Sequence, residues 1–243
     1  MARRCGSLNF GMKTKPERAL AGLSAETTEW LEQNRLERMD ATLAIFDQKR
    51  REFHLDRYRF AAARVEQSRV LDCACGTGYG VRLLCEQGRA ARVIGVDIAP
   101  AAVDYARQHH RVGSAGYLCA SANRLPLADG SVDVLTSFET IEHVPDDRGL
   151  IEEFNRVLRP NGMLIISTPN QWPLEKAPFH IREYDRKAFV ELLELRFHCE
   201  QLFNQNSGSS TPFNHDQPRG IVATTSANQD LAECYIAVCR RTS

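Results

Sequence analysis

The sequence predicts an α/β fold in which helices cover both faces of a mostly parallel sheet and a helical cap precedes it. From residue 68 onward, short runs rich in Val, Ile and Leu alternate with segments of helical spacing. This alternation is typical of a doubly wound sheet, because helices make the crossovers between parallel strands. A glycine-rich turn directly after the first strand, at Gly76–Gly80, supports the same fold class.

Length and composition limit the chain to one such domain with an added segment. It has 243 residues, of which 43% are hydrophobic and 26% are charged, as is ordinary for a globular protein. Basic and acidic residues number 31 each, so there is no electrostatic reason to expect a nucleic acid or an anionic membrane as partner. No run approaches the roughly 20 apolar residues of a membrane span. The first residues also lack the apolar stretch of a signal peptide.

The eight cysteines are interpreted as small hydrophobic residues in a reducing compartment. None belongs to a CxxC pair, which argues against a zinc site or a redox pair of that type. This pattern favours a cytoplasmic protein. Five of them lie in apolar, strand-like runs: Cys73, Cys75, Cys119, Cys234 and Cys239.

Residues 1–66 are predicted to form the cap, and residues 67–243 the ligand-binding domain. Between Ser24 and Val65 there is no Gly or Pro, and apolar residues recur at helical spacing. Ser24 is a suitable helix start. We expect two helices or one broken helix over this range.

The ligand-binding domain is predicted to contain seven strands. The five expected parallel strands are Arg69–Cys75, Arg92–Ile98, Gly116–Ala120, Val132–Phe138 and Met163–Thr168. The expected helices are Gly80–Gln87, Pro100–His110, Asp146–Leu158 and Asp185–Leu195. Two more strands are expected near Cys199–Gln205 and Ala232–Cys239, joined by a polar connection at Asn206–Gly220.

The glycine turn is predicted to lie at a ligand site. In an open parallel sheet, ligands bind beyond the carboxyl ends of the strands, where Gly76, Gly78 and Gly80 are expected. Glycine lets the backbone pass close to a ligand. Alone, the pattern is compatible with a dinucleotide, a nucleoside or no ligand.

Two acidic residues narrow that choice. Asp72, inside the first strand, would repel a pyrophosphate at the loop and attract an ammonium group instead. Asp97 ends the second strand, where a carboxylate can bind the hydroxyls of an adenosine ribose. An ammonium and a ribose together describe S-adenosylmethionine, although each acid could also have a purely structural role.

The stretch from about Val70 to Asn170 resembles the class I S-adenosylmethionine-dependent methyltransferases of the type 11 group. The resemblance is carried by LDCACGTGYG, VIGVDIAP, SANRLPLADGSVDVLTSFETIEHV and EFNRVLRPNGMLIISTPN, in the order and spacing of that family. It implies a Rossmann-like doubly wound sheet of seven strands. It also implies S-adenosylmethionine as the methyl donor and S-adenosylhomocysteine as its product.

The resemblance further assigns roles to individual residues. Ser121 stands where the family usually has an acid that binds the adenine amino group, and its hydroxyl is a weaker acceptor. Aromatic faces near the donor would favour the sulfonium cation. The implied cofactor-binding residues are Asp72, Gly76 and Gly78 at the methionine part, Asp97 at the ribose, Ile98, Ser121 and Ala122 at the adenine, and Tyr79 and Phe138 along the pocket.

A catalytic segment is predicted at the end of the fourth strand. Glu139, Glu142 and His143 are spaced so that one helical turn would place them on one face. They are candidate ligands of Mg²⁺ or Zn²⁺, with His180 as a further candidate. The segment resembles the ExxEH of ubiquinone-pathway and small-RNA 2′-O-methyltransferases, where it is associated with metal. Otherwise His143 is a general base or a packing residue.

The predicted function is methyl transfer to a small molecule, with a hydroxyl of a sugar or phenolic metabolite as the first hypothesis. Arg57 and Tyr58 of the cap either cover the cofactor and shape the acceptor pocket, as in similar methyltransferases, or only pack on the sheet. RNA 2′-O-methylation fits the ExxEH segment but not the zero net charge. The same fold could also belong to a non-catalytic S-adenosylmethionine-binding protein or to a nicotinamide oxidoreductase, and Asp72 opposes the latter.

Overall fold

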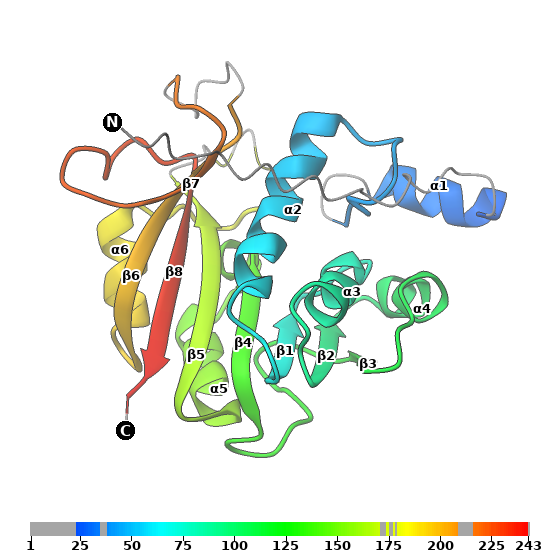
Figure 1. The fold of residues 1–243 in the computed structure, drawn as a ribbon, viewed down its shortest axis with the longest axis horizontal. Coiled ribbons are helices and arrows are strands. Elements are labelled where there is room, and N and C mark those ends of the chain that lie inside the picture. The colour runs from blue at the N-terminus through cyan, green and yellow to red at the C-terminus, as the bar shows by residue number, and fades with distance from the viewer. Residues whose placement is uncertain are drawn as a thin grey trace, which may run out of the picture.

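The computed structural model describes residues 23–34, 38–170, 174, 177, 179–208 and 216–242. Its centre is one mixed sheet in the order β3-β2-β1-β4-β5-β8-β6-β7 (Figure 1). The first five strands of that order are parallel; β8 then pairs antiparallel with β5, β6 antiparallel with β8, and β7 antiparallel with β6. The strands are β1 Arg69–Cys73, β2 Arg92–Asp97, β3 Ala115–Cys119, β4 Val132–Phe138, β5 Leu158–Pro169, β6 Phe197–Asn206, β7 Gly220–Ala223 and β8 Cys234–Arg241.

The predicted doubly wound α/β class is confirmed, but the sheet has eight strands rather than seven. The extra strand, β7, begins at the last residue of the predicted Asn206–Gly220 connection and pairs with β6 at the sheet edge. It is only 4 residues long, and so short an apolar run does not stand out from a loop in the sequence. Of that connection, residues 209–215 lie outside the described part of the chain.

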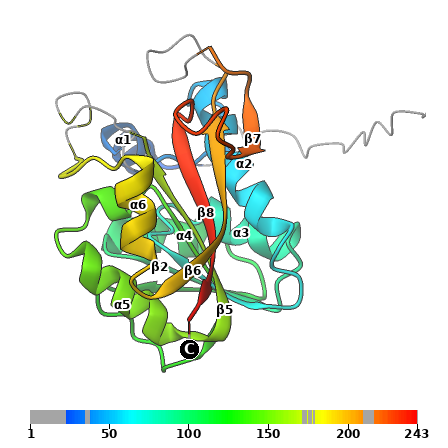
Figure 2. The ribbon, with the colours of Figure 1, turned by 90° about the vertical axis from the view of Figure 1, so that its left-hand side faces the viewer.

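Helices cover both faces of the sheet, and Figure 2 shows α5 and α6 on one side and α2 and α3 on the other. Each face has its own hydrophobic core: residues of α1 to α4 form one, and residues of α5 and α6 form the other. The helices are α1 Ala25–Gln33, α2 Gln48–Ala62, α3 Tyr79–Glu86, α4 Pro100–His109, α5 Asp147–Val157 and α6 Arg186–Leu193, with a 3₁₀ turn, η1, at Ile141–His143.

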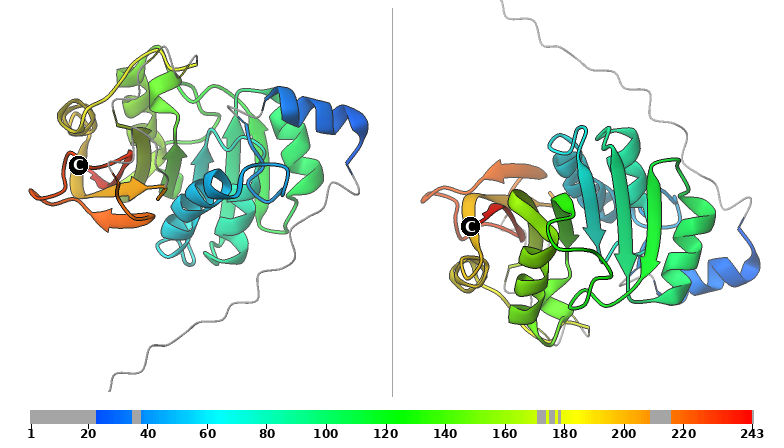
Figure 3. Two further views of the ribbon diagram at one scale, coloured as in Figure 1. Left: turned by 90° about the horizontal axis from the view of Figure 1, so that it is seen from above. Right: turned by 90° about the horizontal axis from the view of Figure 1, so that it is seen from below.

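In its described residues, 23–34 and 38–66, the cap contains two helices and packs directly on the sheet domain. Ser24 is the N-cap of α1, as predicted, and its hydroxyl accepts a hydrogen bond from Thr27 N. Figure 3 shows α1 beside α4, where the rings of Trp30 and Tyr105 stack with their centroids 5.9 Å apart. Cap and sheet residues share one core. The division at residues 66 and 67 stays a prediction.

A buried carboxylate ties the segment between α1 and α2 to the sheet domain. Asp40 accepts hydrogen bonds from the Tyr105 hydroxyl at 2.9 Å and from Thr42, and it lies 2.7 Å from Nε2 of His110. Burial alone would raise the pKa of Asp40, but His110 and Thr42 hold that pKa below its usual value. Thr77, in the glycine turn, also donates to the carbonyl of Met39 at 3.0 Å. The cap segment is therefore fixed directly above the glycine turn.

None of the helices in the described ranges has the length and apolar composition of a membrane-spanning helix. The seven cysteines of the described residues are all free thiols. Cys73, Cys75, Cys234 and Cys239 are buried, as expected for small hydrophobic side chains, whereas Cys119 is exposed.

Candidate active site

A cavity of about 420 Å³ lies at the carboxyl ends of the parallel strands, between the sheet and the cap. This is where a doubly wound sheet binds its ligands, and the volume suits a small organic ligand. It is lined by the turns that follow β1, β2, β3 and β4, and by α2. Of the predicted cofactor-binding residues it contacts Gly76, Tyr79, Asp97, Ile98, Ser121, Ala122 and Phe138; Asp72 and Gly78 do not line it.

The two predicted glycines of the turn have different surroundings. A Cβ atom at Gly76 would meet nothing within 4 Å, because that side of the backbone faces the cavity. At Gly78 a Cβ atom would lie 2.6 Å from Cβ of Ala106 and 3.0 Å from the ring of Tyr117. Gly76 therefore leaves room for a ligand, whereas Gly78 allows α3 to pack closely on α4 and β3.

A third residue of this turn adopts a backbone conformation that favours glycine. Ala74, which lines the cavity, has φ of +61°. An L-residue in this left-handed region costs roughly 1–2 kcal/mol relative to its ordinary conformation. Ala74 thus forms part of the turn beside the cavity, a role for which the sequence pattern indicated only glycines.

Asp97 lies at the end of β2, as predicted, and is only 5% exposed. It accepts hydrogen bonds from the backbone N–H groups of Gly76 and Ala99, both at 2.9 Å. Arg38 of the cap lies 3.5 Å from its Oδ1 atom. The carboxylate is therefore held rigidly at the cavity wall, at the edge where a ribose would lie. No sequence pattern indicates the contact with Arg38.

Asp72 lies beneath the cavity rather than at its surface, since it is 1% exposed. It accepts hydrogen bonds from the hydroxyls of Thr136 at 2.7 Å and Tyr58 at 3.1 Å. Burial raises the pKa of Asp72 to about 7, against the opposing effect of these hydrogen bonds. The direct contact with the methionine part that the resemblance implied stays a prediction. In the structure, Asp72 holds the cap residue Tyr58.

Aromatic and apolar side chains form the remaining cofactor wall. The ring of Tyr58 packs edge-on against Tyr79 and Phe138, with centroid distances of 5.2 and 5.1 Å. Ile98 lines the cavity and is 66% exposed, so its apolar side chain is accessible to a ligand there. Ser121 also faces the cavity. The wall thus offers an apolar surface for a base and aromatic rings near the place of a sulfonium.

Glu139 departs from the predicted arrangement, because it does not share a helical turn with Glu142 and His143. Its φ is +51°, and η1 begins only at Ile141. Its Oε1 atom lies 3.1 Å from Nη2 of Arg57 and accepts a hydrogen bond from Cys234 Sγ at 3.3 Å. The spacing rule fails here because the backbone turns sharply after β4 instead of entering a helix.

Glu142 and His143 are joined instead by His180, the further candidate from the sequence. One ligand atom from each of these three residues lies within 4.8 Å of the others. Nδ1 of His143 is 2.8 Å from the carbonyl of Phe179. A carbonyl can only accept, so Nδ1 carries the proton and Nε2 keeps its lone pair in the neutral ring.

The two glutamates have opposite protonation tendencies. Burial would raise the pKa of Glu139, but the nearby Arg57 guanidinium outweighs it and keeps that pKa below its usual value. Burial raises the pKa of Glu142 well above its usual value, and the charge of Glu139 adds to this. Glu139 is therefore the ionised member of the pair. Within the described residues, Oε1 of Glu142 has no hydrogen-bond partner.

Comparisons with known proteins identify the kind of domain that contains this cavity. Residues 71–166 match the family described as a methyltransferase domain. A protein from Mycolicibacterium smegmatis, named as a probable S-adenosylmethionine-dependent methyltransferase, is 38% identical over 143 residues, which cover 56% of this chain and 54% of that protein. A ubiquinone biosynthesis O-methyltransferase from Neisseria meningitidis is 33% identical over 156 residues, covering 57% of this chain and 64% of the relative. The chain thus spans about half the length of the first of these relatives.

A solved structure shows the same fold over most of the chain. A crystal structure of an S-adenosylmethionine-dependent methyltransferase from Thermotoga maritima, described as a possible histamine N-methyltransferase, matches with a TM-score of 0.62 at 17% identity. The match covers 89% of this chain and 95% of the other. Together with the family match over residues 71–166 and the ligand cavity at the strand ends, it shows that the chain contains a methyltransferase domain and has the fold of S-adenosylmethionine-dependent methyltransferases.

Proposed function

We propose that this protein transfers the methyl group of S-adenosylmethionine to a hydroxyl oxygen of a small molecule. The observation that carries the proposal is the continuous cavity that reaches from Asp97 at the end of β2 to Glu139 and His143 after β4. Methyl transfer from a sulfonium is an in-line displacement, so the protein mainly has to align donor and acceptor in one closed site. A cavity with both groups of residues in its wall can do this.

The cofactor half of the cavity fits an adenosyl group. Asp97 supplies a fixed carboxylate for the ribose hydroxyls, and Gly76 leaves its side of the loop open. Ile98 and Ser121 line the region proposed for the adenine. When S-adenosylmethionine is bound, it supplies an activated methyl group, and these residues orient that group toward the acceptor half.

In the acceptor half, His143 is the proposed general base. Its Nδ1 proton is held by the Phe179 carbonyl, which fixes the ring and leaves Nε2 as the basic atom. A base of this kind is needed for a hydroxyl acceptor, whose proton has to leave as the carbon–oxygen bond forms. The ubiquinone-pathway relative, an O-methyltransferase by name, supports an oxygen acceptor. We propose a phenolic or sugar hydroxyl.

The test is formation of S-adenosylhomocysteine with a panel of phenols and sugars, followed by mass analysis of the product. His143→Ala should lower the rate by on the order of 10² or more without changing affinity for S-adenosylhomocysteine. His143→Gln is the matched variant that retains a polar side chain of similar reach, and it should be equally slow. Wild-type rates in both variants, or methylation at nitrogen, would contradict this mechanism.

A bound metal ion is a second version of the same function. One carboxylate and two imidazoles, from Glu142, His143 and His180, form a donor set that Zn²⁺ uses in proteins. Oε1 of Glu142 accepts no hydrogen bond among the described residues and lies 3.9 Å from Nε2 of His143, which fits this role, whereas Glu139 is occupied by Arg57. A metal held there would act as a Lewis acid toward the acceptor hydroxyl. Exhaustive chelation should then abolish turnover and leave S-adenosylhomocysteine binding intact; full activity after chelation would exclude this version.

RNA methylation and a purely binding role are two further candidates. A polynucleotide follows a track of surface cations, but the arginine beside Glu139 is only 1% exposed. This arrangement favours a small acceptor.

Calorimetry combined with a turnover assay distinguishes an enzyme from a non-catalytic binding protein. A non-catalytic protein would bind S-adenosylhomocysteine and leave every acceptor of the panel unmethylated.

A further inference from the structure

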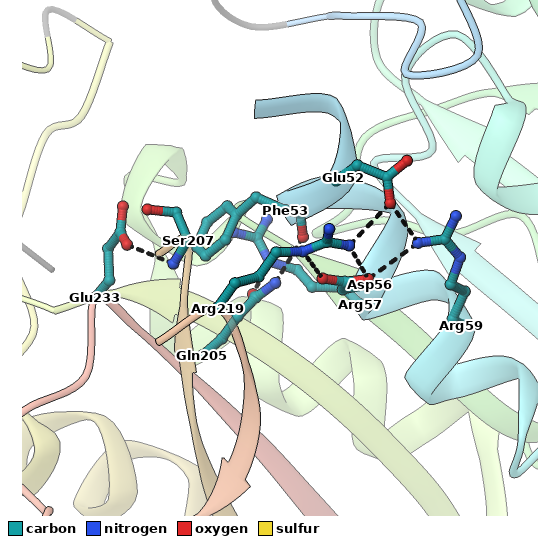
Figure 4. A network of polar contacts seen from close by, with 9 residues as sticks. All are labelled: Glu52, Phe53, Asp56, Arg57, Arg59, Gln205, Ser207, Arg219 and Glu233. Atoms are coloured by element: carbon teal, nitrogen blue, oxygen red, sulfur yellow. Dashed lines mark hydrogen bonds and ion pairs between the residues drawn. The ribbon is translucent and has the colours of Figure 1, made fainter. Parts of the chain in front are cut away.

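Helix α2 separates its charges between two faces. Arg50, His54 and Arg57 follow one another at helical spacing, and all three line the cavity. The helix acids Glu52 and Asp56 face the other way. They form ion pairs with Arg59 and with Arg219, which precedes β7, at distances of 2.7 to 3.0 Å (Figure 4), so their charges are neutralised outside the site. The helix therefore presents the guanidinium groups of Arg50 and Arg57 to the cavity, with the imidazole of His54 between them; burial and the charge of Arg57 lower the pKa of His54 to about 3, so this ring is neutral.

Arg57 is the most firmly held of these side chains, and it is 1% exposed. Its Nε atom donates to the side-chain oxygen of Gln205 at 2.6 Å, and Gln205 donates in turn to the carbonyl of Phe53 at 2.6 Å (Figure 4). The Phe53 ring lies under the guanidinium, with its centroid 4.6 Å from Cζ. The guanidinium plane is thus fixed on one edge and one face, while Arg57 still lines the cavity.

The other edge of this guanidinium is not saturated. Neither Nη1 nor Nη2 has a hydrogen-bond partner among the described residues, although Nη2 lies 3.1 Å from Oε1 of Glu139. Leaving buried donors unpaired is costly, on the order of 1–3 kcal/mol each and more for charged groups. Five donors in a rigid fork are the arrangement that binds a carboxylate or phosphate in bidentate fashion. Nη1, together with Nη2 beside its ion pair with Glu139, therefore keeps donor capacity for an oxyanion.

We propose that Arg57 binds an oxyanion of the methyl acceptor, a carboxylate or a phosphate, so that the substrate is an anionic hydroxy compound. This inference rests on the proposed methyl transfer and specifies its substrate class. Arg57 would be a specificity-determining residue, since binding at its Nη atoms places the acceptor beside Glu139 and in the same cavity as His143. A neutral sugar or phenol would leave the Nη1 donors without a charged partner, and the site would discriminate against it.

The cofactor also carries a carboxylate, but the geometry favours the acceptor as its source. Arg57 is paired with Glu139, after β4, and not with the glycine turn after β1. The next residue, Tyr58, is the one that turns toward the glycine turn: its hydroxyl binds Asp72, and its ring occupies the space above Gly80. The cavity wall extends along α2 from Arg57 to His54 and Arg50, away from the glycine turn. A site for the cofactor carboxylate alone would not need this longer wall.

Calorimetry on the complex with S-adenosylhomocysteine tests the proposal, using benzoate as the anionic probe and benzamide as its neutral counterpart. The wild-type complex should bind benzoate saturably and benzamide at least about tenfold more weakly, as expected when a charge-assisted pair is lost. Arg57→Met should remove that preference, and Arg57→Lys should keep only part of it. Arg59→Met, on the outer face of α2, is the matched control and should behave as wild type. Equal binding of the two probes by the wild type would overturn the proposal, whether or not the variants fold.

The source of the oxyanion is decided with 5′-methylthioadenosine, which lacks the carboxylate of S-adenosylhomocysteine. If Arg57→Met leaves the affinities for both nucleosides unchanged, the acceptor assignment is supported. A selective loss of about tenfold or more in S-adenosylhomocysteine affinity would assign Arg57 to the cofactor carboxylate and overturn it. Failure of the wild type to bind S-adenosylhomocysteine at all would contradict the proposed function itself, which is a separate outcome.

Discussion

Replacing Asp72 by asparagine should change how the stability of the protein depends on pH. In the folded protein, burial raises the pKa of this carboxyl group from 3.8 to about 7. The folded state therefore keeps a proton on Asp72 across a pH range in which the unfolded chain has already lost it. Because the folded state binds more protons there, the free energy of unfolding falls as pH rises from about 4 to about 7. The contribution is fully present below pH 4 and is lost as pH rises through the folded-state pKa.

The size of the effect follows from the gap between the two pKa values. Each pH unit in this window changes the free energy of unfolding by about 1.4 kcal/mol. Between pH 5 and pH 8 the Asp72 contribution therefore amounts to about 3 kcal/mol, most of it lost by pH 7. Asparagine has the same shape and cannot ionise. The loss of stability between pH 5 and pH 8 should therefore be smaller by about 3 kcal/mol in Asp72→Asn than in the wild type.

Urea unfolding at pH 5 and pH 8, followed by circular dichroism without ligand, measures this difference. Titrating groups elsewhere contribute to both proteins and cancel in the comparison. Asp104→Asn is the matched control, because this carboxylate is 63% exposed on α4, and it should show the wild-type pH dependence. If Asp72→Asn and wild type lose equal stability between the two pH values, Asp72 is ionised throughout and its buried, protonated state is refuted.

The glycine turn allows two further predictions, and the acceptor half a third. Gly78→Ala should lower the free energy of unfolding by roughly 2–5 kcal/mol, because its Cβ atom would overlap Ala106. Gly76→Ala should lower the free energy of unfolding by only about 1–2 kcal/mol. It should however weaken S-adenosylhomocysteine binding, since its Cβ enters the cavity. Equal effects of the two on calorimetry and urea melts would contradict these orientations. Ala74→Gly should be neutral or stabilising by up to about 1 kcal/mol, and a clear loss of stability would refute strain at φ of +61°. Glu139→Gln should lower the rate of methyl transfer with little change in cofactor affinity, because Arg57 loses its counter-charge. A wild-type rate in this variant would show that the ion pair has no role in the reaction.

Local sequence signals were sufficient to place Gly76 and Asp97 beside one cavity. The turn at Gly76 and the carboxylate of Asp97 both follow directly from a strand that ends at the same edge of the sheet, so their proximity is a consequence of parallel strand order. Ile98 and Ser121 came from the resemblance to the methyltransferase family, and both line the cavity, after β2 and β3 respectively. The positive φ of Ala74 was not predictable, because the residue is an ordinary alanine in the sequence.

The contacts made by the cap could not be predicted, because they join residues far apart in the chain. Arg57 and Gln205 are 148 positions apart, and Asp40 and His110 are 70 apart. Nothing in the local pattern of either partner indicates such a pairing. The sharp turn at Glu139 is a related case, since its helical spacing with Glu142 holds only if the backbone is helical, and its φ is +51°. Short edge strands such as β7 are likewise set by tertiary pairing rather than by composition.

Binding of S-adenosylhomocysteine to the wild type and to Asp97→Ala, measured by calorimetry, tests most directly whether the cavity is the cofactor site. The wild type should bind one molecule per chain. Asp97→Ala should bind it about tenfold or more weakly, because the fixed carboxylate that accepts hydrogen bonds from the ribose is lost. Asp104→Ala should be unchanged. No binding by the wild type, or equal affinity in Asp97→Ala, would contradict the assignment of this cavity to S-adenosylmethionine.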